Sequence, residues 1–369
     1  MKHTVDVSPL RFFILGITIT FGTSSMTLGH SVAKIAKEDM WLSVLLGSVL
    51  ITISFWTAVR LAKYFPEHTA IEYHCILLGR VLGNILNVIM LSNMILITAI
   101  FMRTFEILLK VYILRETPPV AIVVLVLLAA LYAVQYGMAP VLRMQQFCFI
   151  PVFGIFAVLL LVASTSIDVT NYRPMLAEGT LPIVKGIIPT WFSYGGIEIL
   201  TGFLYPFVTR KKNTFKYGMY SICMITILYV VITGITQGIL GWKEMTYILF
   251  PAVRAYRAVD IPDTFIERLD GYFLIIFIIT TFTALVNWLY FISSGIGQML
   301  KLETNRPVVI ILGLIILYLV LLPRSIIEYQ MLGRWSNLIS MAWGLGVLPV
   351  LLVLAWFQKK RRRKRSRIC

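Results

Sequence analysis

The sequence predicts an all-α, polytopic membrane protein with ten transmembrane helices, arranged as two inverted repeats of five. Hydrophobic residues make up 59% of the 369 residues and charged residues only 14%, far from the balance of a soluble domain. Apolar stretches long enough to cross a bilayer recur along the whole chain. They cover residues 12–29, 40–59, 81–102, 117–142, 144–167, 181–208, 217–242, 271–300, 307–323 and 335–358.

The spacing of these stretches predicts a single transmembrane domain over residues 1–369, because no segment between them could fold as a separate soluble domain. Residues 1–167 form the first five-span repeat, residues 181–358 the second, and residues 359–369 a basic cytoplasmic tail. An odd number of spans per half makes the second half enter the membrane from the opposite side. Such halves can be inverted repeats, with a solute site at their interface.

The distribution of charge indicates that both termini lie in the cytoplasm. With the N-terminus inside, most of the 33 Lys and Arg residues fall on the inner side, whereas Asp260, Asp263, Glu267 and Asp270 share one outer loop. This is the positive-inside pattern. We interpret the tail, which reads KKRRRKR at 359–365, as a clamp on anionic headgroups of the lipid bilayer. The positive-inside pattern and the basic tail account for the net charge of +16, and we expect no nucleic-acid partner.

Catalytic and metal-binding constellations are not evident. The four cysteines are scattered without a C-x-x-C pair, which makes disulfides and metal sites unexpected. The four histidines lie near the ends of the first three spans and do not converge in a core. The sequence therefore predicts that the chain is not an enzyme and needs no cofactor or metal.

Two spans carry interruptions at corresponding places in the two halves. In the sixth span residues 192–198 read FSYGGIE, which places Glu198 at mid-bilayer depth directly after two glycines. A carboxylate there costs roughly 2.5–3.5 kcal/mol on insertion and is tolerated mainly in a bundle interior or wet cavity. In the first span residues 20–29 read TFGTSSMTLG, a composition unfavourable to a regular helix. The alternative for the first span alone is a small-residue packing face.

Paired interruptions of this kind point to a solute site. We expect the two breaks to face each other across the bundle centre, with unwound backbone at both. Free N–H groups at half-helix starts would receive a carboxylate, and carbonyls at half-helix ends an ammonium. The ligand-binding residues predicted from the breaks are Gly22, Thr23, Ser24, Ser25, Tyr194, Gly195, Gly196, Ile197 and Glu198.

Two charged features each leave two interpretations open. Glu198 either contacts a ligand or proton directly, or caps the second half of the broken span, where free N–H groups attract negative charge. Arg103 and Glu106 share one helix face because they are three residues apart. They form either an orienting ion pair or part of an ion or proton pathway.

The break at residues 192–198 and the Gly-rich break in span one resemble the amino acid–polyamine–organocation superfamily. More narrowly, the chain resembles the spore germination permease family, the B subunits of nutrient germinant receptors from endospore-forming bacteria. Residues 171–179, which read NYRPMLAEG, and residues 266–270, which read IERLD, are similar to patterns of that family. The resemblance covers essentially the whole chain. It is weaker at the first break, where Gly29 stands in place of a frequent proline.

This resemblance implies a LeuT-like fold and a receptor role. The chain would sense a nutrient in the spore inner membrane, together with an A subunit and a lipoprotein C subunit, and trigger germination. Spans three and eight would line the same site through Ile97, Phe101, Thr283 and Asn287. Two alternatives stay open: an active amino-acid or organic-cation permease, and a structural subunit whose site no longer binds.

The breaks are small and largely apolar with a few hydroxyls, which predicts a small neutral solute, an amino acid before a sugar or nucleoside. The fifth span, 144–167, lacks the lysine that some proton-linked members of the superfamily carry. Thr280, Thr281 and Thr283 of the eighth span could supply sodium ligands or bond their own helix carbonyls. We expect no strong sodium dependence.

Overall fold

The chain folds into a series of helices in the computed structural model, which describes residues 6–259 and 269–365. Alternating apolar runs, glycines and prolines define where each helix begins and ends. The main helices are α1 (Pro9–Thr20), α2 (Thr23–Ala36), α3 (Met40–Ala62), α4 (Ala70–Leu78), α5 (Arg80–Tyr112), α6 (Pro119–Gln135), α7 (Met138–Ser164), α8 (Leu181–Ser193), α9 (Ile197–Leu204), α10 (Thr214–Tyr247), α11 (Pro251–Ala258), α12 (Leu269–Met299), α13 (Arg306–Leu321), α14 (Ile326–Ala342) and α15 (Leu348–Arg365).

Six helical segments of the described chain are long and apolar enough to cross a membrane. They are Ser24–Ala62, Arg80–Tyr112, Met138–Ser164, Lys211–Tyr247, Leu269–Met299 and Ile326–Lys360. The apolar helices α1, α6 and α13 are shorter. These lengths and compositions confirm the prediction of an integral membrane protein with multiple spans.

Two predicted span boundaries are wrong. The stretch 117–142 is divided, because Gly137 adopts a positive φ of 83° and ends the helix, so that residues 138–142 open α7. The last span begins well before residue 335, since Ser325 caps α14 by accepting the Glu328 N–H at 3.2 Å. Helical backbone then continues through a π-helix at Trp343–Val347 to Arg365. Residues 359–365 are therefore helical and continue α15.

Some predicted features lie outside the described residues. Of the segment 266–270, residues 266–268 are not described, and Leu269 and Asp270 open α12. Asp260, Asp263 and Glu267 of the predicted acidic loop, and residues 366–369 of the tail, also fall outside.

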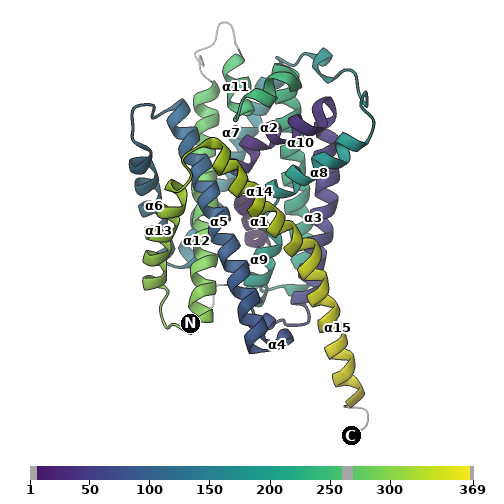
Figure 1. The fold of residues 1–369 in the computed structure, drawn as a ribbon, viewed down its shortest axis with the longest axis vertical. Helices are drawn as coiled ribbons and strands as arrows, with labels where there is room; N and C mark the ends of the chain where they lie inside the picture. The colour runs from purple at the N-terminus through teal and green to yellow at the C-terminus, as the bar shows by residue number, and fades with distance from the viewer. Residues whose placement is uncertain (1–5, 260–268, 366–369) are drawn as a thin grey trace.

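The bundle has two distinct ends (Figure 1). α11 lies at one end, and α4 and the C-terminal part of α15 lie at the other. At the α4 end, Val7 forms an isolated bridge with Val208. Lys211 and Lys359 both contact the segment 64–67 there, through an ion pair of 2.7 Å and a cation–π contact of 5.0 Å. The two ends of the described chain therefore share one side of the molecule with several basic residues.

Small residues bring α3 and α8 into close contact. Ser43 and Gly47 are four residues apart on α3, and they face Gly186 and Thr190, which are four apart on α8. The Ser43 hydroxyl donates to the Ile183 carbonyl at 2.9 Å. Small residues at this spacing let membrane helices approach backbone to backbone. The first half of the interrupted α8–α9 pair is therefore fixed against α3.

The segment 171–179 is fastened to α10. The Asn171 amide donates to the Gly238 carbonyl at 2.8 Å, and the Tyr172 hydroxyl donates to the Gly234 carbonyl at 2.8 Å. A Cβ at Gly238 would lie 2.6 Å from the Tyr172 hydroxyl. Three residues further on, Gly241 kinks α10 with a φ of 72°. The polar residues at the start of this segment therefore anchor the α7–α8 connection to the end of α10.

Replacing Gly238 by Ala should destabilise the protein relative to Gly234→Ala. The added methyl collides with the Tyr172 hydroxyl at Gly238 but has nothing within 4 Å at Gly234. Overpacking costs about 1–3 kcal/mol, whereas Gly to Ala in an open helix position gains up to about 1 kcal/mol. The midpoint of thermal unfolding of the purified protein measures the difference. Equal midpoints for the two variants would contradict the anchoring of Tyr172.

Candidate functional site

Two helix interruptions define the candidate site. Residues 21–22 separate α1 from α2, and residues 194–196 separate α8 from α9. Phe21 is extended, and Gly196 adopts a left-handed conformation with a φ of 112°. Glycine takes up that conformation without the steric cost of a Cβ. Each interruption leaves helix-terminal carbonyls on one side and N–H groups on the other.

Tyr229 of α10 joins the two interruptions. Its hydroxyl lies 3.1 Å from the Thr20 carbonyl and 2.7 Å from the Ser193 carbonyl. These are the last residues of α1 and α8, so the hydroxyl is shared between two half-helix C-termini. Because the dipoles of both half-helices place partial negative charge there, the two ends together form a region that attracts a cation.

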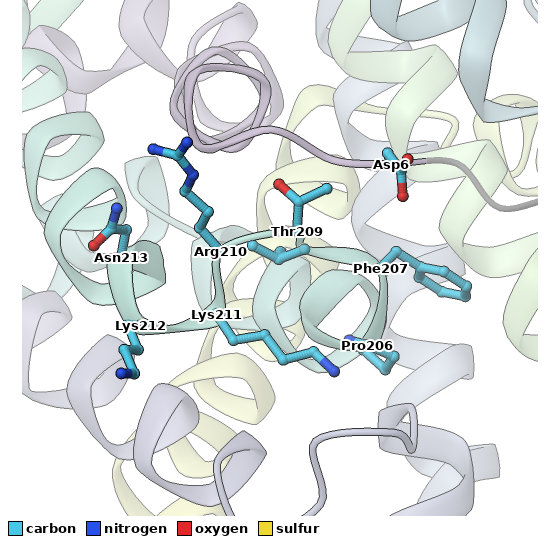
Figure 2. Close-up of a pocket in the computed structure, with 9 residues that line it drawn as sticks. Asp6, Pro206, Phe207, Thr209, Arg210, Lys211, Lys212 and Asn213 are labelled. Atoms are coloured by element: carbon cyan, nitrogen blue, oxygen red, sulfur yellow. The ribbon is translucent and has the colours of Figure 1, made fainter.

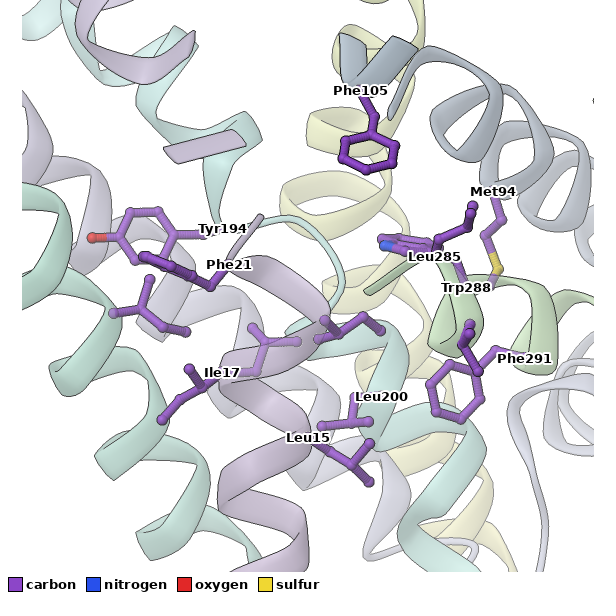
Figure 3. Close-up of a cluster of buried hydrophobic side chains, with 14 of the residues drawn as sticks. Leu15, Ile17, Phe21, Met94, Phe105, Tyr194, Leu200, Leu285, Trp288 and Phe291 are labelled. Carbon is purple, nitrogen blue, oxygen red and sulfur yellow. The ribbon is translucent and has the colours of Figure 1, made fainter. Parts of the chain in front are cut away.

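Aromatic rings surround this junction. The Tyr194 ring meets Tyr229 edge-on with centroids 5.2 Å apart, and its hydroxyl donates to Thr226 at 2.8 Å. Phe21 stacks on Tyr229 and Phe277 with centroids 6.1 and 5.8 Å apart. Figure 3 shows Phe21 and Tyr194 among the labelled residues of the buried cluster. The rings therefore enclose the junction in apolar surface.

The predicted residues of the first break meet α5 and α12. A Cβ on Gly22 would lie 2.8 Å from the Phe101 ring and 3.5 Å from the Thr281 backbone, so Gly22 and Phe101 come together as expected. The Ser25 hydroxyl donates to the Gly22 carbonyl. Ile97 is half-buried, one turn before Phe101 on α5.

The remaining residues of this break begin the second half-helix. Thr23 is the first residue of α2, and Ser24 follows with its side chain half-buried. The structure thus places the Thr23 and Ser24 backbone at a half-helix start, where free N–H groups are available.

The predicted residues of the second break lie against α1 and α12. A Cβ on Gly196 would lie 3.0 Å from the Trp288 ring and 3.3 Å from Ile19. Gly195 is half-buried and donates its N–H to the Phe192 carbonyl at 3.3 Å. Ile197 is fully buried and opens α9.

Glu198 is the second residue of α9 and only 5% exposed. Within the described chain, its Oε2 atom is buried and has no hydrogen-bond partner. A buried polar atom left unpaired costs roughly 1–3 kcal/mol. A carboxylate that served only as a helix cap would not need to bear this cost. One carboxylate oxygen is thus free to receive a partner close to the second break.

Asn287 lies in a closed hydrogen-bonded triangle. Its carbonyl accepts from the Gln145 amide at 2.6 Å, and its amide donates to the Thr18 hydroxyl at 3.3 Å. Thr18 donates in turn to the Gln145 carbonyl at 3.2 Å. The triangle joins α1, α7 and α12 two residues before α1 ends. Asn287 therefore holds α12 to the first half-helix close to the break.

The three threonines of α12 divide between two roles. Thr280 and Thr283 donate to carbonyls of their own helix, at 3.0 Å to Ile276 and 2.8 Å to Thr280. These are the intrahelical bonds that the sequence left as one alternative. Thr281, whose backbone lies near Gly22, has a buried hydroxyl without a partner in the described chain.

The expected pairing of Arg103 and Glu106 is confirmed. Arg103 Nη1 lies 3.0 Å from Glu106 Oε2, and the Glu106 side chain is 2% exposed. The pair stands on α5 beyond Phe101. Within residues 6–259 and 269–365, no group of His, Cys, Asp and Glu side chains is arranged to hold a metal ion.

A hollow at the α4 end does not form a comparable site. It is lined by Asp6 and residues 206–213. Figure 2 shows the side chains of Arg210, Lys211 and Lys212 pointing away from one another. They do not converge on a single ligand, and Lys211 is engaged by Glu67. This is a basic surface of the kind that faces anionic lipid headgroups.

Sequence reasoning missed Tyr229, Trp288 and Gln145, and it named Thr281 only as a candidate sodium ligand. A lone tyrosine or tryptophan in an apolar span has the same sequence signature as core packing, so no local signal identified Tyr229 or Trp288. Gln145 did carry a signal, because an uncharged amide within a membrane span commonly marks an interhelical hydrogen bond.

Comparison with known sequences places the chain among germination proteins. The sequence model of the family described as "Spore germination protein" matches residues 6–327. Spore germination protein YndE of Bacillus subtilis (strain 168) is 26% identical over 98% of this chain and 99% of its own length. Spore germination protein GerQB of Bacillus cereus is 27% identical over 97% and 98%. Spore germination protein A2 of Bacillus subtilis (strain 168) is 24% identical over 92% of both.

Comparison with solved structures shows the fold. The crystal structure of MhsT in complex with L-phenylalanine matches with a TM-score of 0.67 at 13% identity, over 94% of this chain and 98% of that one. A substrate-bound, outward-open Na⁺-coupled sialic acid symporter matches with a TM-score of 0.62 at 12% identity, over 92% and 79%. The chain therefore has a LeuT-like transporter fold, as expected.

Removing the Tyr229 hydroxyl should loosen the junction. Tyr229→Phe leaves the ring contacts but takes a donor from two buried carbonyls, at a cost of about 1–3 kcal/mol. We expect a lower midpoint of thermal unfolding in detergent. Tyr220→Phe, on the exposed face of the same helix, is the control and should match the parent. An unchanged midpoint for Tyr229→Phe would show that the hydroxyl does not hold the half-helices together.

Proposed function

The chain belongs to the spore germination protein family, and we propose that it is the nutrient-sensing B subunit of a germinant receptor that triggers spore germination. The observation that carries the proposal is the meeting of two interrupted helices at one shared hydroxyl. Transporters with this architecture bind solutes at such interruptions. A family of germination proteins that retains this architecture can use solute binding as a signal.

We assign the ten spans as follows. α1 with α2 forms span one, and α8 with α9 forms span six, each interrupted at mid-depth. The other spans are α3, α5, α6, α7, α10, α12, α13, and α14 with α15. Residues 1–167 and 181–358 are then two inverted repeats within one domain, and α4 and α11 lie at opposite ends of the bundle (Figure 1).

The charge distribution supports an orientation. Val7 and Lys359 both lie at the α4 end, which also carries Arg210, Lys211 and Lys212. Positive charge marks the cytoplasmic side, so we place both termini in the cytoplasm. We further propose that the chain resides in the spore inner membrane, with an A subunit and a lipoprotein C subunit as partners.

The proposed ligand is a small neutral amino acid. Its ammonium would face the carbonyl ends of α1 and α8 near Tyr229, and its carboxylate the N–H groups that open α2 and α9. Glu198 Oε2 and the Thr281 hydroxyl are the unpartnered polar atoms close to these positions. MhsT, which shares the fold, was crystallised with L-phenylalanine, and this supports the class of ligand.

The alternative function is an amino-acid permease, which the shared fold with a Na⁺-coupled symporter favours. The uncharged triangle of Thr18, Gln145 and Asn287 argues against strong coupling to an ion, because its polar atoms already satisfy one another. Uptake of radiolabelled amino acid into vesicles that contain the protein separates the two functions. A sensor gives binding without accumulation, whereas sustained accumulation would establish the permease.

Glu198→Gln tests whether the buried charge is needed. An amide still accepts a hydrogen bond, so a passive cap would survive the change, whereas a site that needs the charge would fail. Because Oε2 is unpartnered, we expect normal protein levels but a germination response weakened by about tenfold or more in nutrient concentration. Spore germination as a function of amino-acid concentration measures this. A parental response across pH would show that the charge has no essential role.

Gly22→Ala should narrow the site. The new methyl would lie 2.8 Å from the Phe101 ring, so that ring must shift, and the Gly22 φ of 158° strains a residue that carries a Cβ. We expect a several-fold higher nutrient concentration for half-maximal response, and Phe101→Leu in the same chain should restore part of it by removing the clash.

The matched control is Gly154→Ala, where the added methyl meets nothing within 4 Å. If Gly22→Ala accumulates normally and responds like this control, Gly22 does not border the ligand.

A further inference from the structure

α11 lies at the end of the bundle opposite α4 (Figure 1), and its last residues border a second cavity. The volume of this cavity is about 550 Å³, enough for an amino acid. It is formed where the end of α5, the end of α11 and the start of α12 meet. Tyr112, Arg115, Tyr256, Arg257 and Asp270 line it. We call it the outer cavity.

The charges of the outer cavity match a zwitterion. Arg115 and Arg257 are exposed and, within the described chain, neither forms an ion pair. Their neighbour Arg254 differs, because it is 3.7 Å from Glu244. Asp270, half-buried at the start of α12, supplies a negative group. Two guanidiniums suit a carboxylate, and the Asp270 carboxylate suits an ammonium.

Tyr256 forms the floor of this cavity with an unsatisfied hydroxyl. Its side chain is 1% exposed, and the hydroxyl has no partner among the described residues. Burial raises the pKa of Tyr256, so the hydroxyl remains a donor at physiological pH. Buried hydroxyls are normally paired. Packing alone does not require this hydroxyl, because a phenylalanine would fill the same space.

A line of aromatic rings connects the floor to the first break. Tyr256 stacks on Phe273 with centroids 4.0 Å apart, Phe273 contacts Phe277 at 4.7 Å, and Phe277 stacks on Phe21 at 5.8 Å. Phe21 is in the break between α1 and α2 and contacts Tyr229. Side chains, which can rotate, separate the outer cavity from the proposed solute site.

We propose that the outer cavity is a separate binding site, which receives the amino-acid zwitterion before it reaches the helix interruptions. Arg115 and Arg257 bind the carboxylate, Asp270 binds the ammonium, and the Tyr256 hydroxyl donates to the carboxylate once its ring tilts away from Phe273. The ligand class rests on the proposed function; the site and its residues do not.

The test compares Arg257→Gln with Arg254→Gln in spores that carry the receptor. Each of the twenty standard amino acids is supplied in turn, and the concentration for half-maximal germination is measured for the one that elicits a response. Arg257→Gln should raise this concentration about tenfold. Its maximal rate at saturation should stay near that of the parent, because the central site is intact. Arg254→Gln should respond like the parent.

Tyr256→Phe provides a second variant with a distinctive outcome. Loss of an unpartnered hydroxyl should leave the protein level and thermal stability unchanged or raised, while the half-maximal concentration rises several-fold. Parental dose–response curves for both Arg257→Gln and Tyr256→Phe, at normal protein levels, would overturn the outer site alone. Complete loss of response at saturation would also overturn it, since that places these residues in the central site. A parent that responds to no amino acid would overturn the proposed function and the ligand assigned here.

Discussion

The hydroxyl of Tyr229 is the contact on which the candidate site depends. It lies within hydrogen-bonding distance of the carbonyl ends of two separate half-helices. Helix ends that carry partial negative charge repel each other in a low-dielectric interior. A donor shared between them lowers that cost, and so would the ammonium of a solute. The same place is therefore suited both to hold the interruptions together and to exchange one donor for another on binding.

The surrounding helices restrict which parts can respond. α8 is held on α3 through Ser43, Gly47 and Gly186, and α1 is held by the triangle of Gln145, Asn287 and Thr18. Both contacts lie on the half-helices that precede the breaks. Close packing and satisfied polar groups make them rigid. A change on binding would then be carried by α2 and α9, which begin after the breaks and whose first residues include Glu198.

The sequence predicted the structure well where the residue types present are compatible with few backbone conformations or environments. Adjacent glycines beside a buried acid predicted the interruption at 194–196, and apolar length predicted the six long helical segments that could cross a membrane. It was uninformative where the partner is distant in the chain. Tyr229 resembles any core aromatic, and Asn287 faces Gln145 and Thr18 only because three helices converge. The predicted last span, 335–358, is shorter than the helix because helices extend beyond the apolar stretch, as α15 does through residues 359–365.

Protection of a cysteine at the second break tests the central claim most directly. Gly195 is half-buried, and the nearest atom to an added Cβ is the Phe192 carbonyl oxygen at 3.4 Å, so Gly195→Cys fits there. In a chain whose Cys75, Cys148, Cys223 and Cys369 are replaced by Ser or Ala, the rate of labelling by a small membrane-permeant maleimide is measured. We predict that the amino acid which triggers germination slows labelling, at concentrations that match its dose–response, and that an inactive amino acid does not. Equal labelling rates with and without the active amino acid, in a variant that still germinates, would contradict a solute site at the helix interruptions.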